Sequence, residues 1–257
     1  MDLGLDGAVA LVTGGARGVG RGIVSVLADA GARVVICGRS EPEDLRDGVA
    51  FRTCDVRSAE DVAAVVDWIL GQFGRLDIAV NNAGGAPFAM AADASPRLHS
   101  KIVELNLLAP LVVAQAANAV MQRQDGGGAI VMVSSVSGHR PSPGTAAYGA
   151  AKAGLDSLTT TLAVEWAPKV RVNSVVAGMV HTEQSHLHYG DDDGIAAVGR
   201  TVPLGRMARP EEIGNCVAFL ASPLASYVSG AILAAHGGGE APAFLSAANS
   251  EHTREGQ

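Results

Sequence analysis

Short apolar runs alternate with longer stretches of helical periodicity along most of the chain. The runs are continuous rather than alternating with polar residues, which is typical of strands that are buried on both faces. Strands that alternate with helices indicate a parallel sheet with right-handed crossovers. The pattern therefore predicts an α/β fold, a doubly wound parallel sheet flanked by helices on both faces. Its seven strands are residues 8–12, 33–37, 49–53, 76–80, 129–133, 170–176 and 231–235.

Local signals set the ends of several helices. Residues 18–30 keep a helical period and stop at Gly31, a residue type that commonly follows a helix C-terminus. A second periodic stretch covers residues 58–73, with Ser58 as its expected N-cap. A third helix begins at about Tyr148, continues through leucines at helical spacing, and ends before a proline.

No linker, repeat or low-complexity tract interrupts this pattern, so we expect a single domain over residues 1–257. Two segments depart from it. Residues 181–201 are polar and are expected to form a loop that acts as a lid over a substrate. Residues 240–257 are rich in small and then polar residues, which predicts a partly disordered tail.

Composition excludes several function classes. The formal net charge is −7 and no basic stripe is present, so binding to nucleic acid has no electrostatic support. Three widely spaced cysteines without a CxxC pair are typical of reduced thiols in a cytosolic protein. Asp2 and Asp6 argue against a secretory signal, and no uncharged apolar stretch reaches membrane-spanning length. We therefore expect a cytoplasmic protein with no membrane partner.

A glycine-rich turn follows the first predicted strand. Glycines at this point allow a tight turn and let backbone N–H groups approach an anion, and the dipole of the following helix favours negative charge. The spacing is GxxxGxG, and the expected ligand is the diphosphate of a dinucleotide. The residues expected to bind it are Gly14, Arg17, Gly18, Val19 and Gly20.

The end of the second strand bears on the choice of cofactor. A carboxylate there would bind ribose hydroxyls and favour NAD(H). The chain has Gly38, Arg39 and Ser40 instead, and a guanidinium is suited to the 2′-phosphate of NADP(H). Arg17 adds a second positive charge. NADP(H) is therefore the expected cofactor, with NAD(H) as the alternative.

Tyr148 and Lys152 are four residues apart on a predicted helix, so the phenol and the ammonium can be neighbours. A phenol needs a nearby cation to lower its pKa toward neutrality, and a carbonyl that receives a hydride needs a proton donor of this kind. Ser134 and Ser135 follow the fifth strand, at the edge of the sheet where ligands bind. Asn106 lies in an apolar helix, where its amide needs a buried hydrogen-bond partner. The alternative is a structural amide whose hydrogen bonds are made with the backbone.

Together these motifs resemble the short-chain dehydrogenase/reductase family, whose members include 3-oxoacyl-carrier-protein reductases and hydroxysteroid dehydrogenases. The resemblance covers nearly all of residues 8–239. It implies a Rossmann fold and interconversion of a ketone and a secondary alcohol. The motifs that carry it are Thr13-Gly14-x3-Gly18-x-Gly20, Asp55-Val56, Asn81-Asn82-Ala83-Gly84, Asn106, Ser135 and Tyr148-x3-Lys152.

The resemblance implies a role for each matching residue. Tyr148 would be the general acid in reduction and the base in oxidation, and Ser135 would bind the substrate oxygen. Lys152 would lower the Tyr148 pKa and bind the nicotinamide ribose, and Asn106 would hold a water in a proton relay. Asp55 and Val56 would contact the adenine. The remaining residues expected to line the cofactor groove are Asn82, Ala83, Gly84, Val180 and Thr182.

The chain departs from the family pattern at Ala177-Gly178, where Pro-Gly is usual, which puts the placement of Val180 and Thr182 in question. The resemblance also implies a homo-oligomer, a tetramer or a dimer. The function class that competes with an enzyme is a non-catalytic dinucleotide sensor or scaffold on the same fold. A third hypothesis is a serine hydrolase that uses Ser135, but the chain lacks the GxSxG turn of such enzymes. The histidines of residues 181–188 show no metal-ligand framework, so no metal is expected.

Overall fold

The computed structural model describes residues 2–247, and in it seven strands form one parallel sheet in the order β3-β2-β1-β4-β5-β6-β7. Each strand lies within a residue or two of its expected position, so the prediction of a doubly wound α/β fold is confirmed. The strands are β1 Val9–Thr13, β2 Arg33–Gly38, β3 Ala50–Thr53, β4 Ile78–Asn81, β5 Gly128–Ser135, β6 Val170–Ala177 and β7 Ile232–Ala235.

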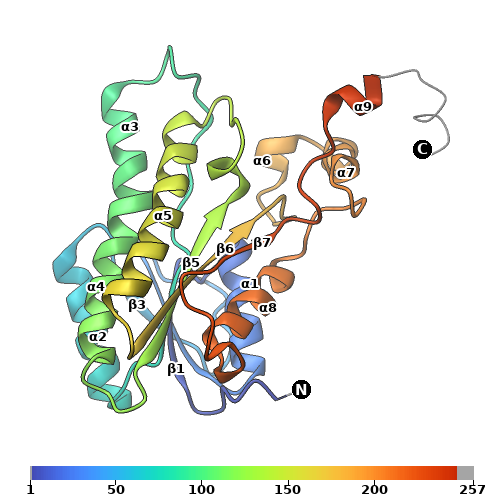
Figure 1. Ribbon diagram of the computed structural model, residues 1–257. Coiled ribbons are helices and arrows are strands. Elements are labelled where there is room, and N and C mark those ends of the chain that lie inside the picture. The colour runs from blue at the N-terminus through green and yellow to red at the C-terminus, as the bar shows by residue number, and fades with distance from the viewer. Residues whose placement is uncertain (1, 248–257) are drawn as a thin grey trace.

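Helices cover both faces of the sheet (Figure 1). Helices α1 (Gly18–Asp29) and α8 (Pro210–Ala221) pack on one face, where Ile23 and Val217 are fully buried. The other face carries α2 (Ala59–Phe73), α4 (Ala109–Met121) and α5 (Ala146–Glu165). Two apolar layers thus enclose the sheet, which is why its strands are continuous apolar runs.

The local signals in the sequence correspond to real helix ends. Ser58 accepts a hydrogen bond of 3.1 Å from the Asp61 N–H at the start of α2. Gly31 follows α1 with a φ of +85°, a left-handed conformation that glycine adopts without strain. Helix α2 therefore begins, and α1 ends, for the reasons that the sequence indicated.

The apolar helix around Asn106 has three parts. Helix α3 (Pro96–Val103) continues through a π-helical turn, Glu104–Leu108, into α4. Within residues 2–247, Pro96–Met121 is the stretch whose length and composition would allow it to cross a membrane. In this fold it contributes Val113, Ala117 and Met121 to the core, and a core helix of a globular protein meets the same criteria.

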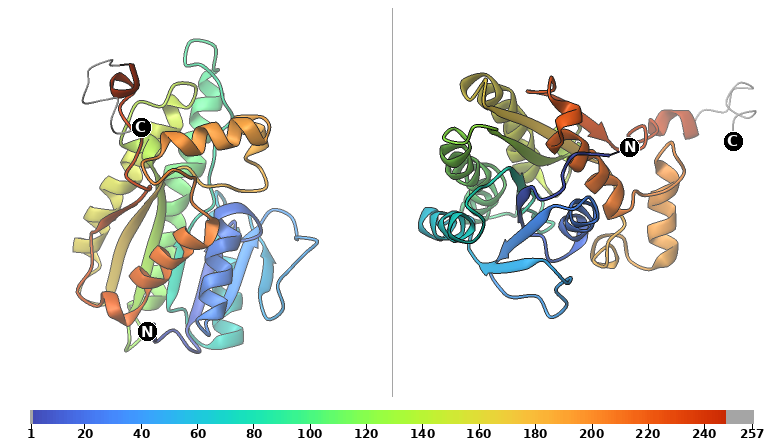
Figure 2. Two further views of the ribbon diagram at one scale, coloured as in Figure 1. Left: turned by 90° about the vertical axis from the view of Figure 1, so that its right-hand side faces the viewer. Right: turned by 90° about the horizontal axis from the view of Figure 1, so that it is seen from below.

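Residues 181–201, expected to be a loop, contain the short helices α6 (His186–Tyr189) and α7 (Asp192–Thr201). Asp191 caps α7 by accepting a 3.0 Å hydrogen bond from the Gly194 N–H, a local signal that favours a helix. The left view of Figure 2 shows this segment across the end of the molecule at which α1 begins. The predicted tail contains α9 (Ala243–Ala247), and residues 248–257 lie outside the described part.

Candidate active site

The strand order reverses between β1 and β4, and the predicted site residues gather at the carboxyl ends of these strands and of β5. Thr13, the last residue of β1, joins the two sides of the reversal. Its hydroxyl oxygen accepts 3.0 Å hydrogen bonds from the backbone N–H groups of Asn82 and Ala83. The Asn82 amide donates in turn to the carbonyls of Thr13 and Gly14, at 2.9 and 3.1 Å. A reversal of strand order is where α/β sheets bind ligands.

The glycine-rich turn has the shape that the sequence predicts. Gly14 and Gly18 have φ values of +64° and +53°. A Cβ on Gly20 would lie 2.2 Å from the Gly14 carbonyl oxygen, so only glycine fits there. Arg17, the residue before α1, makes no capping hydrogen bond, and Val19 belongs to the first turn. This glycine-lined helix start fits the diphosphate of a dinucleotide.

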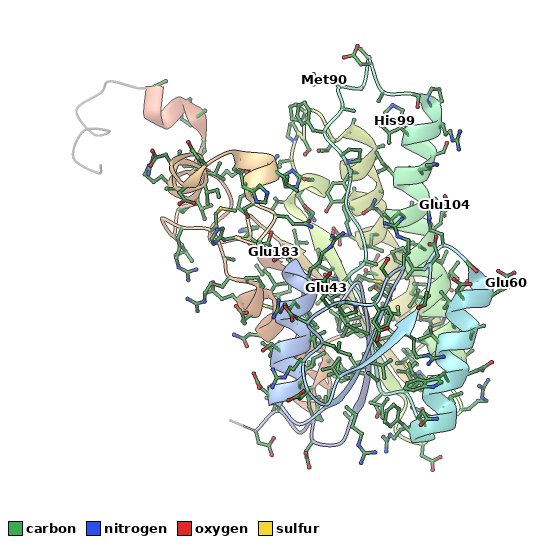
Figure 3. The ribbon with its side chains drawn as sticks, turned by 180° about the vertical axis from the view of Figure 1, so that it is seen from behind. Glu43, Glu60, Met90, His99, Glu104 and Glu183 are labelled. Atoms are coloured by element: carbon green, nitrogen blue, oxygen red, sulfur yellow. The ribbon has the colours of Figure 1, made fainter. Side chains whose placement is uncertain are left out.

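Glu183 lies at the same helix start. Its Oε1 accepts a 3.0 Å hydrogen bond from the Gly18 N–H, and Figure 3 shows the side chain at the upper end of α1. A carboxylate thus lies where we expect the phosphate oxygens. The sequence analysis missed this residue because nothing in its local pattern brings residue 183 to residue 18.

The predicted adenosine end lies beyond β2 and β3. Arg39 and Ser40 are exposed, and Val56 is 7% exposed. Both carboxylate oxygens of Asp55 accept hydrogen bonds from the Arg57 guanidinium, the longer at 2.9 Å. These bonds lower the pKa of Asp55 to about 2, and the positive charge of Arg39 contributes to that decrease. Asp55 therefore has a cationic partner that the sequence analysis did not include.

Val180 and Thr182 are held in defined places despite the missing proline. Val180 forms a parallel bridge with Ala208, next to a 2.8 Å hydrogen bond from the His181 N–H to the Ala208 carbonyl. The Thr182 methyl lies 3.6 Å from the position that a Cβ on Gly18 would occupy. The segment therefore passes next to the glycine-rich turn.

Ser135, the last residue of β5, lies beside Tyr148. Burial raises the pKa of Tyr148 above its ordinary value, and the interaction with the Ser135 side chain opposes that increase. Ser134 points elsewhere, because its hydroxyl donates to Asp156 at 2.9 Å. Ser134 is therefore bound to Asp156, and Ser135 is the serine beside the phenol.

Lys152 is 3% exposed, and its Nζ lies 5.6 Å from the centre of the Tyr148 ring. The ammonium donates a 2.7 Å hydrogen bond to the Val133 carbonyl. Burial lowers the pKa of Lys152 to about 8, and the negative charge of Asp156 opposes that decrease. The raised pKa of Tyr148 differs from the expectation that the ammonium lowers it, since here burial is the dominant cause.

Asn106 is fully buried in the π-helical turn. Its amide donates to the carbonyls of Gly85 and Ile102, at 2.9 and 2.8 Å, and its oxygen accepts from the Gly85 N–H at 2.8 Å. The side chain thus anchors the segment after β4, which is the structural alternative considered from the sequence. Gly84 lies between Asn106 and Lys152, because a Cβ there would be 2.7 Å from the Asn106 oxygen and 3.5 Å from Nζ.

A cavity of about 490 Å³ lies between the start of α1 and residues 181–195. Gly18, Thr182 and Glu183 are among its lining residues, whereas Ser135, Tyr148 and Lys152 are not. The cavity therefore adjoins the expected diphosphate position rather than the proton donor. Within residues 2–247, no group of three or more His, Cys, Asp or Glu side chains could hold a metal ion.

Comparisons with known proteins agree over nearly the whole chain. A family model described as enoyl-(acyl carrier protein) reductase matches residues 14–240. The chain is 35% identical to a tropinone reductase homologue of Arabidopsis thaliana over 251 residues, which cover 93% of each chain. It is 36% identical to a 3-oxoacyl-[acyl-carrier-protein] reductase of Vibrio cholerae over 244 residues, 92% of this chain and 98% of that one.

The fold is also similar to solved structures. The ligand-free aldohexose dehydrogenase of Thermoplasma acidophilum superposes with a TM-score of 0.86 at 29% identity, and the match covers 91% of this chain and 94% of that one. A short-chain alcohol dehydrogenase from Sinorhizobium meliloti, described as putative, gives a TM-score of 0.84 at 34% identity, covering 93% and 98%.

Proposed function

The chain belongs to the short-chain dehydrogenase/reductase family and is an oxidoreductase of that family, and we propose that it interconverts a ketone and a secondary alcohol with Tyr148 as proton donor and acceptor. The observation that carries this proposal is the position of the Tyr148 phenol beside Ser135 and the buried Lys152 ammonium. A phenol, a hydroxyl and a cation that converge at the edge of the sheet suit a carbonyl oxygen that gains a proton.

Each side chain has a distinct part in this proposal. Tyr148 gives its proton to the substrate oxygen in reduction and takes it back in oxidation. The Ser135 hydroxyl holds the same oxygen and orients the carbonyl group. Lys152 places a positive charge beside the phenol, which favours phenolate whenever the proton has left. The nicotinamide dinucleotide that the family uses supplies or accepts the hydride.

The residues around the glycine-rich turn fit that cofactor. Gly14, Gly18 and Gly20 carry no side chain, so a diphosphate can approach the backbone of the turn closely, and Thr182 lies beside Gly18. The Gly18 N–H can bind the diphosphate once the Glu183 carboxylate has left it. We infer a preference for NADP(H), because Arg39 is exposed at the end of β2 and its positive charge reaches Asp55. A guanidinium in that place suits a 2′-phosphate.

The substrate is proposed to be a fairly apolar ketone, such as a 3-oxoacyl thioester, a steroid-like ketone or a cyclic ketone. The Tyr189 hydroxyl contacts the Met179 sulfur at 3.3 Å, which brings α6 to the end of β6. Phe88 and Leu187 are 72% and 68% exposed. These apolar side chains favour an apolar substrate. Leu187 and Tyr189 lie within residues 181–201, and we propose that this segment acts as a lid over the substrate.

The decisive test is Tyr148→Phe, assayed for NADPH oxidation with a panel of these ketones. Loss of the proton donor should lower kcat by about 10²- to 10⁴-fold and leave NADPH binding intact. Tyr227→Phe is the matched control, since Tyr227 is fully exposed. Unchanged turnover in Tyr148→Phe would remove Tyr148 from the chemistry, and a wild-type chain that binds NADPH but turns over no ketone would favour a dinucleotide sensor.

A cytoplasmic location and assembly into a dimer or tetramer are part of the same proposal. The three cysteines, Cys37, Cys54 and Cys216, are free thiols, which supports the first. Leu108 at the start of α4 and Val164 near the end of α5 are 50% and 80% exposed, which fits a helical interface between subunits. Light scattering of the purified chain measures its subunit number directly.

A further inference from the structure

Asp156 is a buried carboxylate on the same helix as the proposed proton donor, and the proposed function leaves it without a role. It follows Lys152 by one helical turn, as Lys152 follows Tyr148, so the three side chains lie along the same side of α5. Asp156 is only 8% exposed. A charge in such a place is costly unless donors and a countercharge satisfy it.

Three donors hold this carboxylate, each from a different element. Ser174 on β6 donates to Oδ1 at 2.7 Å, and Ser134 on β5 donates to Oδ2 at 2.9 Å. His139, which follows the turn Val136–Gly138, lies 2.8 Å from Oδ2 through its Nε2. Both serines are buried, whereas the side chain of His139 is 48% exposed. The carboxylate is therefore fixed and linked to the surface by an imidazole.

The same cluster joins the two elements of the proposed site. The Ser134 hydroxyl also lies 3.3 Å from the backbone carbonyl of Lys152, while Nζ of Lys152 bonds the carbonyl of Val133, the residue before Ser134. A Cβ on Gly138 would lie 2.7 Å from the Ala153 nitrogen, so the turn Val136–Gly138 lies directly on α5. Asp156 therefore ties α5 to the end of β5, where Ser135 lies.

We propose that Asp156 is a positioning residue for Lys152, a fixed negative charge that keeps the buried ammonium protonated and holds α5 in register with the end of β5. The proposal depends on the proposed function only for the importance of Lys152. Asp156 lies one helical turn from Lys152, and its charge reaches the ammonium without a direct ion pair. Among the described residues, the titratable side chain in contact with Lys152 is Tyr148, and the neighbours from other elements are the neutral Gly84 and Val133. The titratable neighbour of Asp156 from another element is His139.

The test reads the charge of Lys152 directly. The chain contains three lysines, Lys101, Lys152 and Lys169, so ¹³C-lysine labelling of the full chain gives three side-chain NMR signals, and Lys152→Arg identifies the one that matters. Asp156→Asn should lower the titration midpoint of Lys152 by about one pH unit or more, because a countercharge is lost in a buried place. Asp156→Glu should restore the midpoint.

Ser174→Ala is the matched control, since it removes one donor to the same carboxylate and keeps the charge. It should lower stability without moving the Lys152 midpoint. An equal midpoint in wild type and Asp156→Asn would overturn the proposal and leave Asp156 a structural residue. The alkaline limb of kcat should move in the same direction as the midpoint.

If Asp156→Asn fails to fold, Asp156→Ser gives the same comparison. A lower Lys152 midpoint than in the wild-type chain supports the proposal, and an equal midpoint overturns it. The test measures the titration midpoint of Lys152 and not ketone turnover. A chain that reduces no ketone therefore counts against the proposed function and not against the role of Asp156.

Discussion

At the scale of single residues, the site depends on charges that are fixed by backbone and by buried hydroxyls. Lys152 illustrates this, because its ammonium donates a hydrogen bond to the Val133 carbonyl and interacts electrostatically with the Asp156 carboxylate. Asn106 is equally constrained by Gly85 and Ile102. Residues of this kind are preorganised, which is what electrostatic catalysis requires.

Glu183 leads to a prediction at the same scale. Its carboxylate accepts the hydrogen bond of the Gly18 N–H, where a diphosphate oxygen is expected. It should therefore compete with the diphosphate of the cofactor for this donor and repel its negative charge. Glu183→Gln should tighten NADPH binding by about two- to fivefold at low salt, the range of an exposed charge pair. Fluorescence titration measures the Kd, and about 1 M salt should remove most of the difference.

Glu211→Gln is the control for this prediction, because Glu211 lines the same cavity without contacting Gly18. It should change the Kd less than Glu183→Gln does. Equal or weaker NADPH binding in Glu183→Gln would show that the carboxylate does not compete with the diphosphate.

At the scale of elements, the start of α1 leaves no space for a side chain at Gly20. Gly20 faces the Gly14 carbonyl oxygen, and a methyl group there would also approach the Asn82 amide nitrogen at 2.5 Å. The close approach of α1 to β1 and to the segment after β4 therefore depends on the absence of a side chain at residue 20.

Gly20→Ala is accordingly expected to destabilise the chain by about 1–3 kcal/mol or more and to weaken NADPH binding. Gly71→Ala in α2 is the matched comparison, since nothing lies within 4 Å of the added Cβ. It should stabilise the chain by about 0.5–1 kcal/mol. Urea unfolding measures both free energies, and equal effects of the two substitutions would contradict the packing described for α1.

At the scale of the whole molecule, cofactor binding joins elements that are distant in the sequence. The glycine-rich turn, the end of β2, the segment after β4 and residues 180–183 all border one edge of the sheet. A ligand that contacts all of them binds the folded state alone, so it should stabilise the whole domain.

NADPH at 100 times its Kd should stabilise the chain by about 2.7 kcal/mol and raise Tm by about 5 to 10 °C. NADH at the same concentration should raise Tm less, because Arg39 then has no 2′-phosphate to bind. Arg39→Ala should reduce the difference between the two cofactors in a thermal-shift assay. Stronger stabilisation of the wild-type chain by NADH would contradict the preference for NADP(H).

The strands, the glycine-rich turn and the position of the Tyr148 helix were predictable because each depends on neighbours in the sequence. Buried strands are continuous apolar runs, a cap such as Ser58 acts within three residues, and the turn requires glycine locally. Helices α6 and α7 were missed because the polar composition of residues 181–201 outweighed the Asp191 cap.

The sequence by itself determined the fold class, the family and the residues that carry the proposed proton transfer. Only the tertiary structure decided which side chains surround them: Glu183 at the start of α1, Arg57 on Asp55, and Asp156 with its donors from β5, β6 and the turn before α5. The physical reason is that pKa values and hydrogen bonds depend on burial and on charges brought close in space, whereas sequence patterns report only local conformation and the face that each element buries.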